Sequence, residues 1–435
     1  MNMLVLFGLL MVLLTIGMPV GFAIGAATII TMYTLTNLDL VLVAQHSFAG
    51  INSFTLLAIP FFMLAGTIMS RGGIAKRIVD FADSLVGFVT GALGAISLLA
   101  CMFFGTLSGS GMATTSAIGS MMIPEMSKNG YDRAYAATLT AYGGITGPVL
   151  PPSLALVIYG SVTGTSIAKL FIAGIIPGIM LIFFLIAANY YICKKYKFGI
   201  VEKKPERQIR ISEMIVKRVL NVLRTLKNGF WALLSPVIIL GGIYAGIFTP
   251  TEAACVSVVY SLIISVCVYK ELKLKELWDT FLDTSVLNGV TSFLLAYSTV
   301  FAVFFTHANL PSIIREFLSD FAPNKFVMLL FINLIVLSIG LFLDLIPATI
   351  ILAPILLPSA VSFGVSPVHF GVIIALNLGI GLCTPPYGCN LFVGAAVGNT
   401  KVDLMFKYMW PLLISMLLCL MLVTFIPALS LVLVK

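Results

Sequence analysis

Apolar runs of about 20 residues follow one another along almost the whole of this 435-residue chain. A helix of that length spans the hydrocarbon core of a bilayer, where no water can bind free backbone groups. Only 10% of the residues are charged, against roughly 25% in soluble domains. The chain therefore predicts an all-α polytopic membrane protein. Met1 leads directly into the first apolar run, so we expect no cleaved leader.

The positive charge is concentrated in one polar segment, residues 194–228. This segment contains 11 of the 25 Lys and Arg residues: Lys194, Lys195, Lys197, Lys203, Lys204, Arg207, Arg210, Lys217, Arg218, Arg224 and Lys227. Basic loops beside membrane spans stay in the cytoplasm, so we interpret the segment as a cytoplasmic connector that sets the orientation. That placement argues against nucleic-acid binding, whereas a basic face for a soluble partner stays open as an alternative.

No pattern of an enzyme is present in the sequence. The seven cysteines lie almost entirely in apolar runs, without CxxC or metal-ligand spacing, so we expect them to pack. There is no Walker A sequence for ATP hydrolysis, and no paired acid or Ser-His arrangement suits proteolysis within the membrane.

The chain matches itself at an offset of 234 residues, without a gap, from Pro124–Pro177 to Pro358–Pro411. The matched pairs are Pro124/Pro358, Gly130/Gly364, Ala141/Ala375, Gly147/Gly381, Pro151/Pro385, Pro152/Pro386, Gly160/Gly394, Gly164/Gly398, Leu170/Leu404 and Pro177/Pro411. Eight of these ten pairs are Gly or Pro, the residues that set backbone shape. The match predicts a duplicated fold, and repeats with broken helices are typical of secondary transporters.

The duplication divides the chain into a first repeat (1–193), the basic connector (194–228) and a second repeat (229–435). In the first we expect spans at about 2–17, 19–36 and 53–70, a re-entrant hairpin at 86–126, a broken helix at 133–163 and a span at 168–193. In the second we expect spans at about 229–247, 251–270 and 283–306, a hairpin at 326–360, a broken helix at 368–398 and a span at 403–433. Each half then crosses five times, so the second half is inverted and both termini lie outside. Residues 2–36 could instead form one long tilted helix.

The two hairpin tips and the two breaks are the candidate site. The first tip, "GTLSGSGMATTSAIG" (Gly105–Gly119), is rich in hydroxyl groups: Ser108, Ser110, Thr114, Thr115 and Ser116. The second, "GLFLDLIPATIILAP" (Gly340–Pro354), contains Asp344, Pro347 and Thr349. The breaks are "GPVLPPS" and "TPPYG", where proline leaves upstream carbonyls, near Gly147 and Val149, without a donor. Hydroxyl and carbonyl oxygens suit a small cation, and the N-termini of half-helices suit a carboxylate. Alternatively, the Ser and Thr side chains bond only to their own helices.

The charge distribution favours Na⁺ over protons as the coupling ion. The three histidines, His46, His307 and His369, are expected at span edges, and only Glu252 and Asp344 among the acids are expected at membrane depth. A proton relay needs a chain of buried ionisable groups. Asp344 could bind Na⁺, accept hydrogen bonds from substrate hydroxyls, or cap a hairpin helix.

Four motifs, "GIFTPTEAA" (Gly246–Ala254), "AIPFFMLAG" (Ala58–Gly66), "GPVLPPS" and "TPPYG", give the chain its resemblance to a known family. It resembles, over essentially its whole length, the large membrane subunit of tripartite ATP-independent periplasmic (TRAP) transporters. The resemblance implies a bacterial inner-membrane transporter of the elevator type, with scaffold and transport domains, driven by Na⁺. A periplasmic substrate-binding protein would deliver the substrate, and a four-helix membrane subunit would be a separate chain.

The resemblance, carried over by motif position, also implies site residues. For the substrate we expect Ser108, Ser110, Ser153, Asp344 and Tyr387, with Gly111 at the same tip. For a first Na⁺ site we expect Ser108, Gly109, Thr114, Gly147, Val149 and Pro151. For a second Na⁺ site we expect Gly340, Thr349, Gly381, Thr384 and Pro386.

The substrate is expected to be an organic acid. No arginine lies in the expected site, which favours a monocarboxylate. The resemblance favours sialic acid (N-acetylneuraminate), with C4-dicarboxylates as the alternative. Two further alternatives are a Na⁺/carboxylate symporter that needs no binding protein and a purely structural membrane subunit. The first usually has an "SNT"-like signature at its tips, from which "SGSGMATTSA" departs.

Overall fold

The computed structural model describes residues 2–36, 38–86, 91–199, 211–310, 312–314, 316, 322, 324–385 and 388–434, and within these ranges the regular structure is entirely helical. The elements up to residue 199 are α1 (Asn2–Thr15), α2 (Val20–Leu35), α3 (Val41–Ile51), the short 3₁₀ helix η1 (Thr55–Leu57), α4 (Ala58–Arg71), α5 (Ile74–Val86), α6 (Ala92–Ser108), α7 (Gly111–Lys128), α8 (Arg133–Gly144), α9 (Thr146–Val149), α10 (Leu154–Thr163) and α11 (Ile167–Tyr196). Those after residue 210 are α12 (Ile211–Tyr244), α13 (Pro250–Leu262), the π-helix η2 (Ile263–Val268), α14 (Leu274–His307), α16 (Lys325–Gly340), α17 (Leu345–Ser362), α18 (Pro367–Gly381), α19 (Cys389–Gly398), α20 (Val402–Phe425) and α21 (Ala428–Leu431).

Seven helices among the described residues are long and apolar enough to cross a membrane, or eight if the bent pair α3–α4 counts as one span. The bend between α3 and the η1–α4 segment is 60°. Shorter apolar helices, α6, α16, α18 and α19 among them, stand beside these spans. The prediction of an all-α polytopic membrane protein is confirmed.

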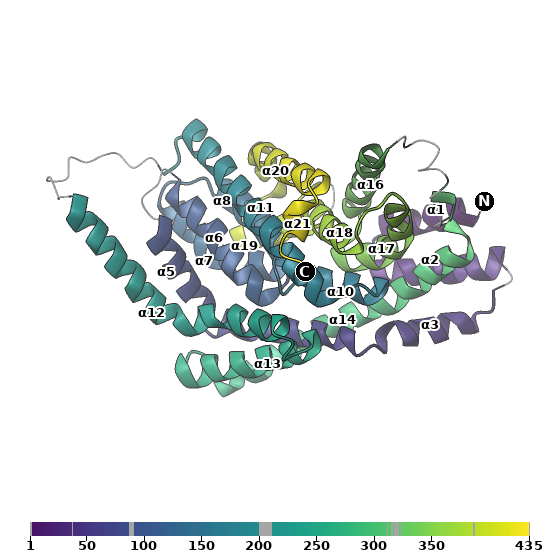
Figure 1. The fold of residues 1–435 in the computed structure, drawn as a ribbon, viewed down its shortest axis with the longest axis horizontal. Coiled ribbons are helices and arrows are strands. Elements are labelled where there is room, and N and C mark those ends of the chain that lie inside the picture. Colours follow the sequence, from purple (N-terminus) through teal and green to yellow (C-terminus); the bar gives the residue numbers. More distant parts are fainter. Residues whose placement is uncertain are drawn as a thin grey trace.

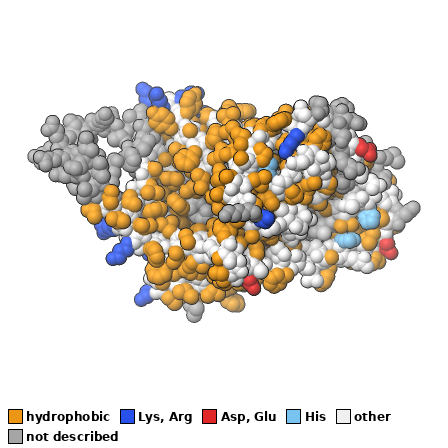
Figure 2. Space-filling view, in the orientation of Figure 1, with side chains coloured by type: hydrophobic (Ala, Val, Ile, Leu, Met, Phe, Trp, Pro, Cys, Tyr) orange, Lys and Arg blue, Asp and Glu red, His pale blue; other side chains and the backbone are white. Residues whose placement is uncertain are grey.

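Apolar side chains cover much of the outer surface (Figure 2). Tyr33, Phe48, Trp278 and Trp410 are all more than 60% exposed. Contiguous apolar patches of this extent are rare on soluble monomers. Lipid chains are the surroundings in which such a surface is stable.

The beginning of the chain forms two helices and not one. α1 ends at Thr15 and α2 begins at Val20. Gly17 lies between them with φ +87°, a left-handed conformation that glycine adopts easily. The alternative of a single tilted helix over 2–36 is therefore wrong.

Three helices begin where the sequence pattern did not indicate them, and one of them, α3, lies between the second and third predicted spans. α5 follows the third predicted span and is amphipathic, burying Ile74, Ile78 and Ala82. α12 begins at Ile211, so the last part of the basic segment is continuous with the first predicted span of the second half. The polar connector is therefore shorter than 194–228.

The motif "TPTEAA" begins α13. Thr249 caps the helix, and its hydroxyl accepts a hydrogen bond from Glu252 N. The Glu252 carboxylate in turn accepts from Thr249 N at 2.8 Å, which completes a capping box. Glu252, expected at membrane depth, is exposed. His369, expected at a span edge, lies near the start of α18 but is buried against Thr424 O.

The helices lie in two groups (Figure 1). α3, α12, α13 and α14 run along one side, with α1 and α2 at one end. α14 packs against α2, α3, α4 and α17, and α12 packs against α5 and α13. The second group contains α6–α11 and α16–α21, and it includes both candidate tips and both breaks.

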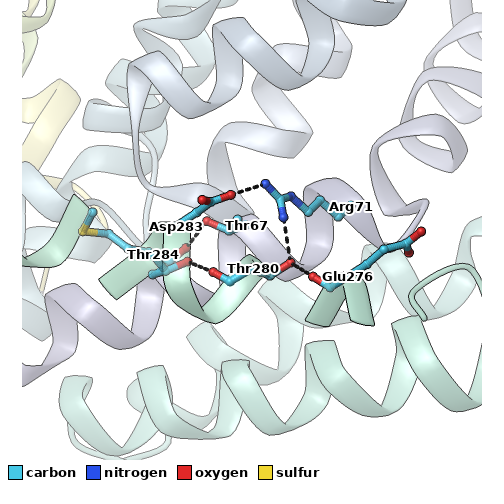
Figure 3. A network of polar contacts seen from close by, with 7 residues as sticks. Thr67, Arg71, Glu276, Thr280, Asp283 and Thr284 are labelled. Atoms are coloured by element: carbon cyan, nitrogen blue, oxygen red, sulfur yellow. Dashed lines mark hydrogen bonds and ion pairs between the residues drawn. The ribbon is translucent and has the colours of Figure 1, made fainter. Parts of the chain in front are cut away.

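Hydrogen bonds and an ion pair connect α4 to α14 within the first group (Figure 3). Arg71 forms an ion pair with Asp283 at 2.5 Å and donates to Thr280 Oγ1 at 3.2 Å. Nearby, Arg77 pairs with Glu271 at 2.7 Å. These partly exposed pairs contribute about 0–1 kcal/mol each. The first pair joins α4 to α14, and the second joins α5 to the segment that precedes α14.

Helix ends recur at the offset found in the sequence. α7 ends at Lys128 and α17 at Ser362, 234 positions later, and α8 and α18 begin at Arg133 and Pro367 with the same spacing. The turn glycines before α8 and α18, Gly130 and Gly364, have φ of +82° and +74°. The turn between α7 and α8 and the turn between α17 and α18 therefore have the same local backbone plan.

Candidate functional site

The first tip is a two-residue turn between α6 and α7. Gly109 has φ +61°, and its N–H donates to Gly105 O at 2.9 Å, so it ends α6. Ser110 then begins α7, because its hydroxyl accepts from Ala113 N at 3.4 Å. A turn this short requires the left-handed conformation, which explains the glycine.

Oxygen atoms gather on the inner side of this tip. Ser108 Oγ lies 2.9 Å from Thr114 Oγ1, and Thr114 Oγ1 donates to Ser110 O at 2.8 Å. Ser108 Oγ is also 3.3 Å from Ser110 O. Ser108 and Thr114 are buried, whereas Ser116 is exposed. The tip thus places the Ser108 and Thr114 hydroxyls, both expected at the first Na⁺ site, beside the carbonyl of Ser110, which was expected at the substrate.

The first tip packs directly on the first break. Leu154 N donates to Gly109 O at 3.3 Å. A Cβ at Gly109 would lie 2.8 Å from Pro152 O, and one at Gly147 would lie 2.7 Å from Ser110 O. Both glycines are therefore required for the approach of the two segments, which brings Gly109, Ser110 and Gly147 together.

The other predicted residues of the first break have different surroundings. Ser153 begins α10, and its buried hydroxyl contacts Leu156 N at 3.3 Å and Pro148 O. It closes the break and is not free for a ligand. Val149 O packs against Gly174 of α11. Pro151 lines a separate apolar cavity of about 460 Å³ between α5, α6, α11 and α12.

The second tip joins α16 to α17. Asp344 begins α17, and its Oδ1 accepts from Leu345 N at 2.8 Å, so the capping role considered in the sequence is present. Thr349 is buried and donates to Leu345 O at 2.7 Å. No second hydrogen bond reaches the Asp344 carboxylate from the described residues. Asp344 therefore keeps an oxygen available to a ligand.

The second tip packs on the second break as the first tip does. A Cβ at Gly381 would lie 2.7 Å from Gly340 O, so these two predicted residues are in contact. Thr384 Oγ1 donates to Ile380 O at 2.8 Å. The hydroxyls of Thr349 and Thr384 are thus each bonded within their own segment, which is the alternative considered in the sequence. Pro386 and Tyr387 lie outside the described residues.

All four segments meet at one small cavity of about 50 Å³. It is lined by Gly109, Ser110, Gly111 and Met112 of the first tip, Pro148 and Leu154 of the first break, Asp344, Leu345 and Ile346 of the second tip, and Leu382 of the second break. α7, α10 and α17 all begin at this cavity. Helix N-termini carry partial positive charge and free N–H groups, so their convergence favours an anion.

A much larger cavity of about 1070 Å³ adjoins the tips. Its walls are the α1–α2 turn, the middle of α14 around Gly289 to Leu294, and Met112, Phe342, Asp344 and Cys389. Asp344 lines both cavities. Among the described lining residues of the two cavities there is no Lys, Arg or His. The cavity lies between the two helix groups and is wide enough for an organic molecule.

One functional candidate, Asn390, was missed in the sequence. It is fully buried at the start of α19, and its amide donates to Ala141 O at 3.4 Å, across to the first broken helix. Cys383 donates to the same carbonyl at 3.2 Å. A polar residue directly after a Pro-Pro break, within an apolar run, is the signal that could have identified it.

Comparison with known proteins gives one result over the whole chain. The family model described as tripartite ATP-independent periplasmic transporter, DctM component, matches residues 7–429. The chain is 35% identical to the C4-dicarboxylate TRAP transporter large permease protein DctM of Rhodobacter capsulatus, over 100% of this chain and 99% of that protein. It is 38% identical to the sialic acid TRAP transporter large permease protein SiaM of Vibrio cholerae, over 97% of this chain and 96% of that protein.

Two further comparisons extend this result. The chain is 38% identical to the isethionate TRAP transporter permease protein DctMQ of Oleidesulfovibrio alaskensis over 98% of its own length, and it spans 65% of that protein. Among solved structures, the chain superposes on Neisseria gonorrhoeae MtrF with a TM-score of 0.57 and 15% sequence identity. The superposition covers 89% of this chain and 85% of MtrF, which belongs to a class of antimetabolite efflux pumps. The likeness to MtrF is one of fold alone.

The relatives are transporter permeases, so the chain is a transport protein and not an enzyme. Together with the apolar helices, they show a multi-pass protein of the bacterial inner membrane. The chain belongs to the DctM family, the large membrane component of tripartite ATP-independent periplasmic transporters.

Proposed function

We propose that this chain takes up an organic acid together with Na⁺ by an elevator mechanism. The observation that carries the proposal is the meeting of three helix N-termini, α7, α10 and α17, at one cavity beside a cluster of tip hydroxyls. Positive helix ends suit the carboxylate of the substrate, and oxygen clusters at broken helices suit the coupling ion. One small region offers both.

Asp344 limits the substrate class. A carboxylate at this position repels a second substrate carboxylate, but it accepts hydrogen bonds from hydroxyl or amide groups. The absence of basic residues from the described cavity walls supports the same choice. We therefore favour a hydroxylated monocarboxylate, with sialic acid (N-acetylneuraminate) as the best candidate. C4-dicarboxylates are the alternative, because one relative is named for them.

The Na⁺ ions are assigned to the two tip–break contacts. At the first, Ser108, Thr114 and the carbonyl of Ser110 are already clustered beside Gly109 and Gly147. At the second, Gly340 and Gly381 are in contact, with Thr349 and Thr384 nearby in sequence. Thr349 and Thr384 would have to give up hydrogen bonds within their own segments to bind the ion.

The elevator proposal rests on the two helix groups and on the repeated backbone plan. We assign α1–α4 and α12–α14 to the scaffold, and the tips and broken helices to the transport domain. The recurrence of helix ends at 234 positions supports two repeats, and five crossings in each half make them inverted. The large cavity between the groups would then connect the substrate site with one side of the membrane.

Two partners follow from the family. Systems of this type combine a large permease with a small membrane subunit and a periplasmic binding protein. We propose that both are separate chains here, with the binding protein delivering the acid to the outward-facing surface.

Uptake into proteoliposomes tests the function. The full chain, its small subunit and its binding protein are reconstituted, and labelled N-acetylneuraminate or succinate is supplied under an inward Na⁺ gradient. We expect Na⁺-dependent uptake of N-acetylneuraminate that persists when only the proton gradient is collapsed. Uptake of succinate alone would shift the assignment to C4-dicarboxylates. Uptake without any binding protein would favour the independent symporter, and no uptake of any acid would favour a structural subunit.

A further inference from the structure

Two buried side chains beside the first tip have polar atoms without a partner among the described residues: Thr115 Oγ1 and Asn390 Oδ1. Both side chains are 0% exposed. Thr115 lies in the first turns of α7, and Asn390 lies at the start of α19. Buried polar atoms in native proteins are nearly always bonded to protein, water or an ion. Two such atoms close together therefore form a candidate site for a ligand.

The two side chains face the crossing of α7 and α8. A Cβ added at Gly144 would collide with Thr115 Oγ1 and would lie 2.7 Å from Gly111 O and 3.2 Å from Asn390 Nδ2. A Cβ added at Gly111 would lie 3.0 Å from Asn390 Nδ2, 3.3 Å from Gly144 O and 3.4 Å from Asn390 Oδ1. Oxygen atoms from α7, α8 and α19 thus surround the same small region.

Acceptors outnumber donors there. Gly144 O has no helical donor four residues later, because that residue is Pro148. One N–H of Asn390 Nδ2 is engaged by Ala141 O at 3.4 Å, and that carbonyl also accepts from Cys383 Sγ at 3.2 Å. The amide therefore presents Oδ1 as an acceptor. The hydroxyl of Thr115 and the second N–H of the Asn390 amide are the side-chain donors left among these groups.

We propose that this region binds a further Na⁺ ion, separate from the two tip–break sites. The proposal rests on the proposed Na⁺ coupling and adds a third position to it. Hydroxyl, amide and carbonyl oxygens are the ligands that such a cation prefers, and Na⁺ in transporters is held by carbonyls at the C-terminal ends of broken helices. Gly144 is the last residue of α8. The start of α7 carries partial positive charge, which would repel a cation. The Ser110 hydroxyl accepts a hydrogen bond from Ala113 N and so offsets part of that charge.

The chemistry selects a monovalent ion. Divalent cations require carboxylate ligands, and the described residues hold no cluster of three or more acidic, His or Cys side chains. The ion would be shared by the first tip, the first broken helix and the second break. It would therefore link the two halves of the site, so that loading of one tip–break site strengthens the other.

Thermal unfolding of the full chain in detergent tests the proposal without any substrate. The melting temperature is measured against NaCl concentration, with choline chloride holding the ionic strength constant. Thr115→Val removes the hydroxyl at nearly constant volume, Thr115→Ser keeps it, and Asn390→Ala removes the amide oxygen. Thr138→Val is the matched control, because Thr138 is a buried threonine of α8 whose hydroxyl bonds to Ala134 O.

We expect Thr115→Val and Asn390→Ala to need about tenfold more Na⁺ for half of the stabilisation, as the loss of one ligand implies, and to lower the Hill coefficient. Thr115→Ser and Thr138→Val should respond to Na⁺ as the unmodified chain does. Thr115→Val and Asn390→Ala are independent, so either can carry the test if the other does not fold. An unchanged Na⁺ response in them, with only a constant loss of stability, would overturn the third site alone. No Na⁺-specific stabilisation of the unmodified chain would instead overturn the proposed coupling to Na⁺.

Discussion

Asp344 carries the one charge among the described residues that line the two cavities of the site. One of its oxygens caps α17, and this arrangement satisfies an N–H group that would otherwise be free to bind an anion. The other three helix-start residues at the tips and breaks, Ser110, Ser153 and Gly388, are uncharged. The site is therefore polarised, with its anion-binding side at α7 and α10 and its acceptor side at Asp344.

Replacing Asp344 tests this polarity. Asp344→Asn keeps an oxygen that can cap α17 but loses the charge, so the fold should be retained. A hydrogen bond to a charged group is worth about 1.5–3 kcal/mol, so we expect the half-saturation concentration for a hydroxylated acid to rise about tenfold or more. Uptake kinetics in proteoliposomes measure it. Asp403→Asn, at an exposed position of α20, is the matched control. Equal kinetics for Asp344→Asn and the unmodified chain would leave Asp344 with a capping role only.

The sequence indicated which segments form the candidate site. It did not indicate which side-chain atoms in those segments are free to bind a ligand. Gly109, Gly147, Gly340 and Gly381, all expected at the Na⁺ sites, lie where each tip approaches its break closely, because Gly and Pro directly determine backbone shape. The hydroxyl groups were harder to assign. Ser153 bonds across its own break, since a hydroxyl in a membrane protein bonds to the nearest free carbonyl, and the sequence does not show which carbonyls are free.

At the scale of elements, each tip is held on its break by glycine. A Cβ at Gly147 would lie 2.7 Å from the backbone carbonyl group of Ser110. Backbone atoms cannot move aside as the end of a flexible side chain can. Gly147→Ala should therefore lower stability by about 1–3 kcal/mol and weaken the response to Na⁺, measured by thermal unfolding with and without NaCl. Gly241→Ala is the control, because Gly241 lies within α12 with open space around its Cα. Loss of stability in both variants to the same extent would contradict the close-approach argument.

The element boundaries that the sequence missed have a common cause. α5 and the start of α12 are helices with polar faces, so a search for apolar runs does not detect them. They pack against each other, and Thr225 of α12 bonds to Ser84 of α5 at 2.9 Å. A helix with a polar face leaves only an amphipathic pattern in the sequence, which is a weaker signal than a run of 20 apolar residues.

At the scale of the whole molecule, the orientation in the membrane follows from charge. The basic connector should lie in the cytoplasm, and residues after the next span should lie in the periplasm. A reporter enzyme that is active only in the periplasm, fused after Phe248, should be active, whereas the same reporter fused after Lys197 should be inactive. A cytoplasmic reporter at the same two positions is the control and should give the reverse pattern. Activity of the periplasmic reporter after Lys197 would reverse the proposed topology.

The elevator proposal predicts that access to Ser110 changes from one side of the membrane to the other. If the tips and broken helices move as one block against the scaffold, the cavity at Ser110 must open to one side of the membrane at a time. Ser110→Cys should fold, since the Ser110 cap bond is long at 3.4 Å and loss of a cap costs only about 0.5–2 kcal/mol.

Labelling of that cysteine should depend on the state of the transporter. Cys267, which is exposed, and Cys389, which lines the large cavity, are first replaced by serine so that they do not react. A membrane-impermeant thiol reagent should then label Ser110→Cys from one side in Na⁺ alone and become less effective when substrate is added. This follows because a ligand shifts an equilibrium only by its different affinity for the two states. Ser116→Cys, exposed on the same helix, is the control for access to the reagent. Equal labelling of Ser110→Cys from both sides under every condition would mean a continuous passage, and a single moving block could not produce it.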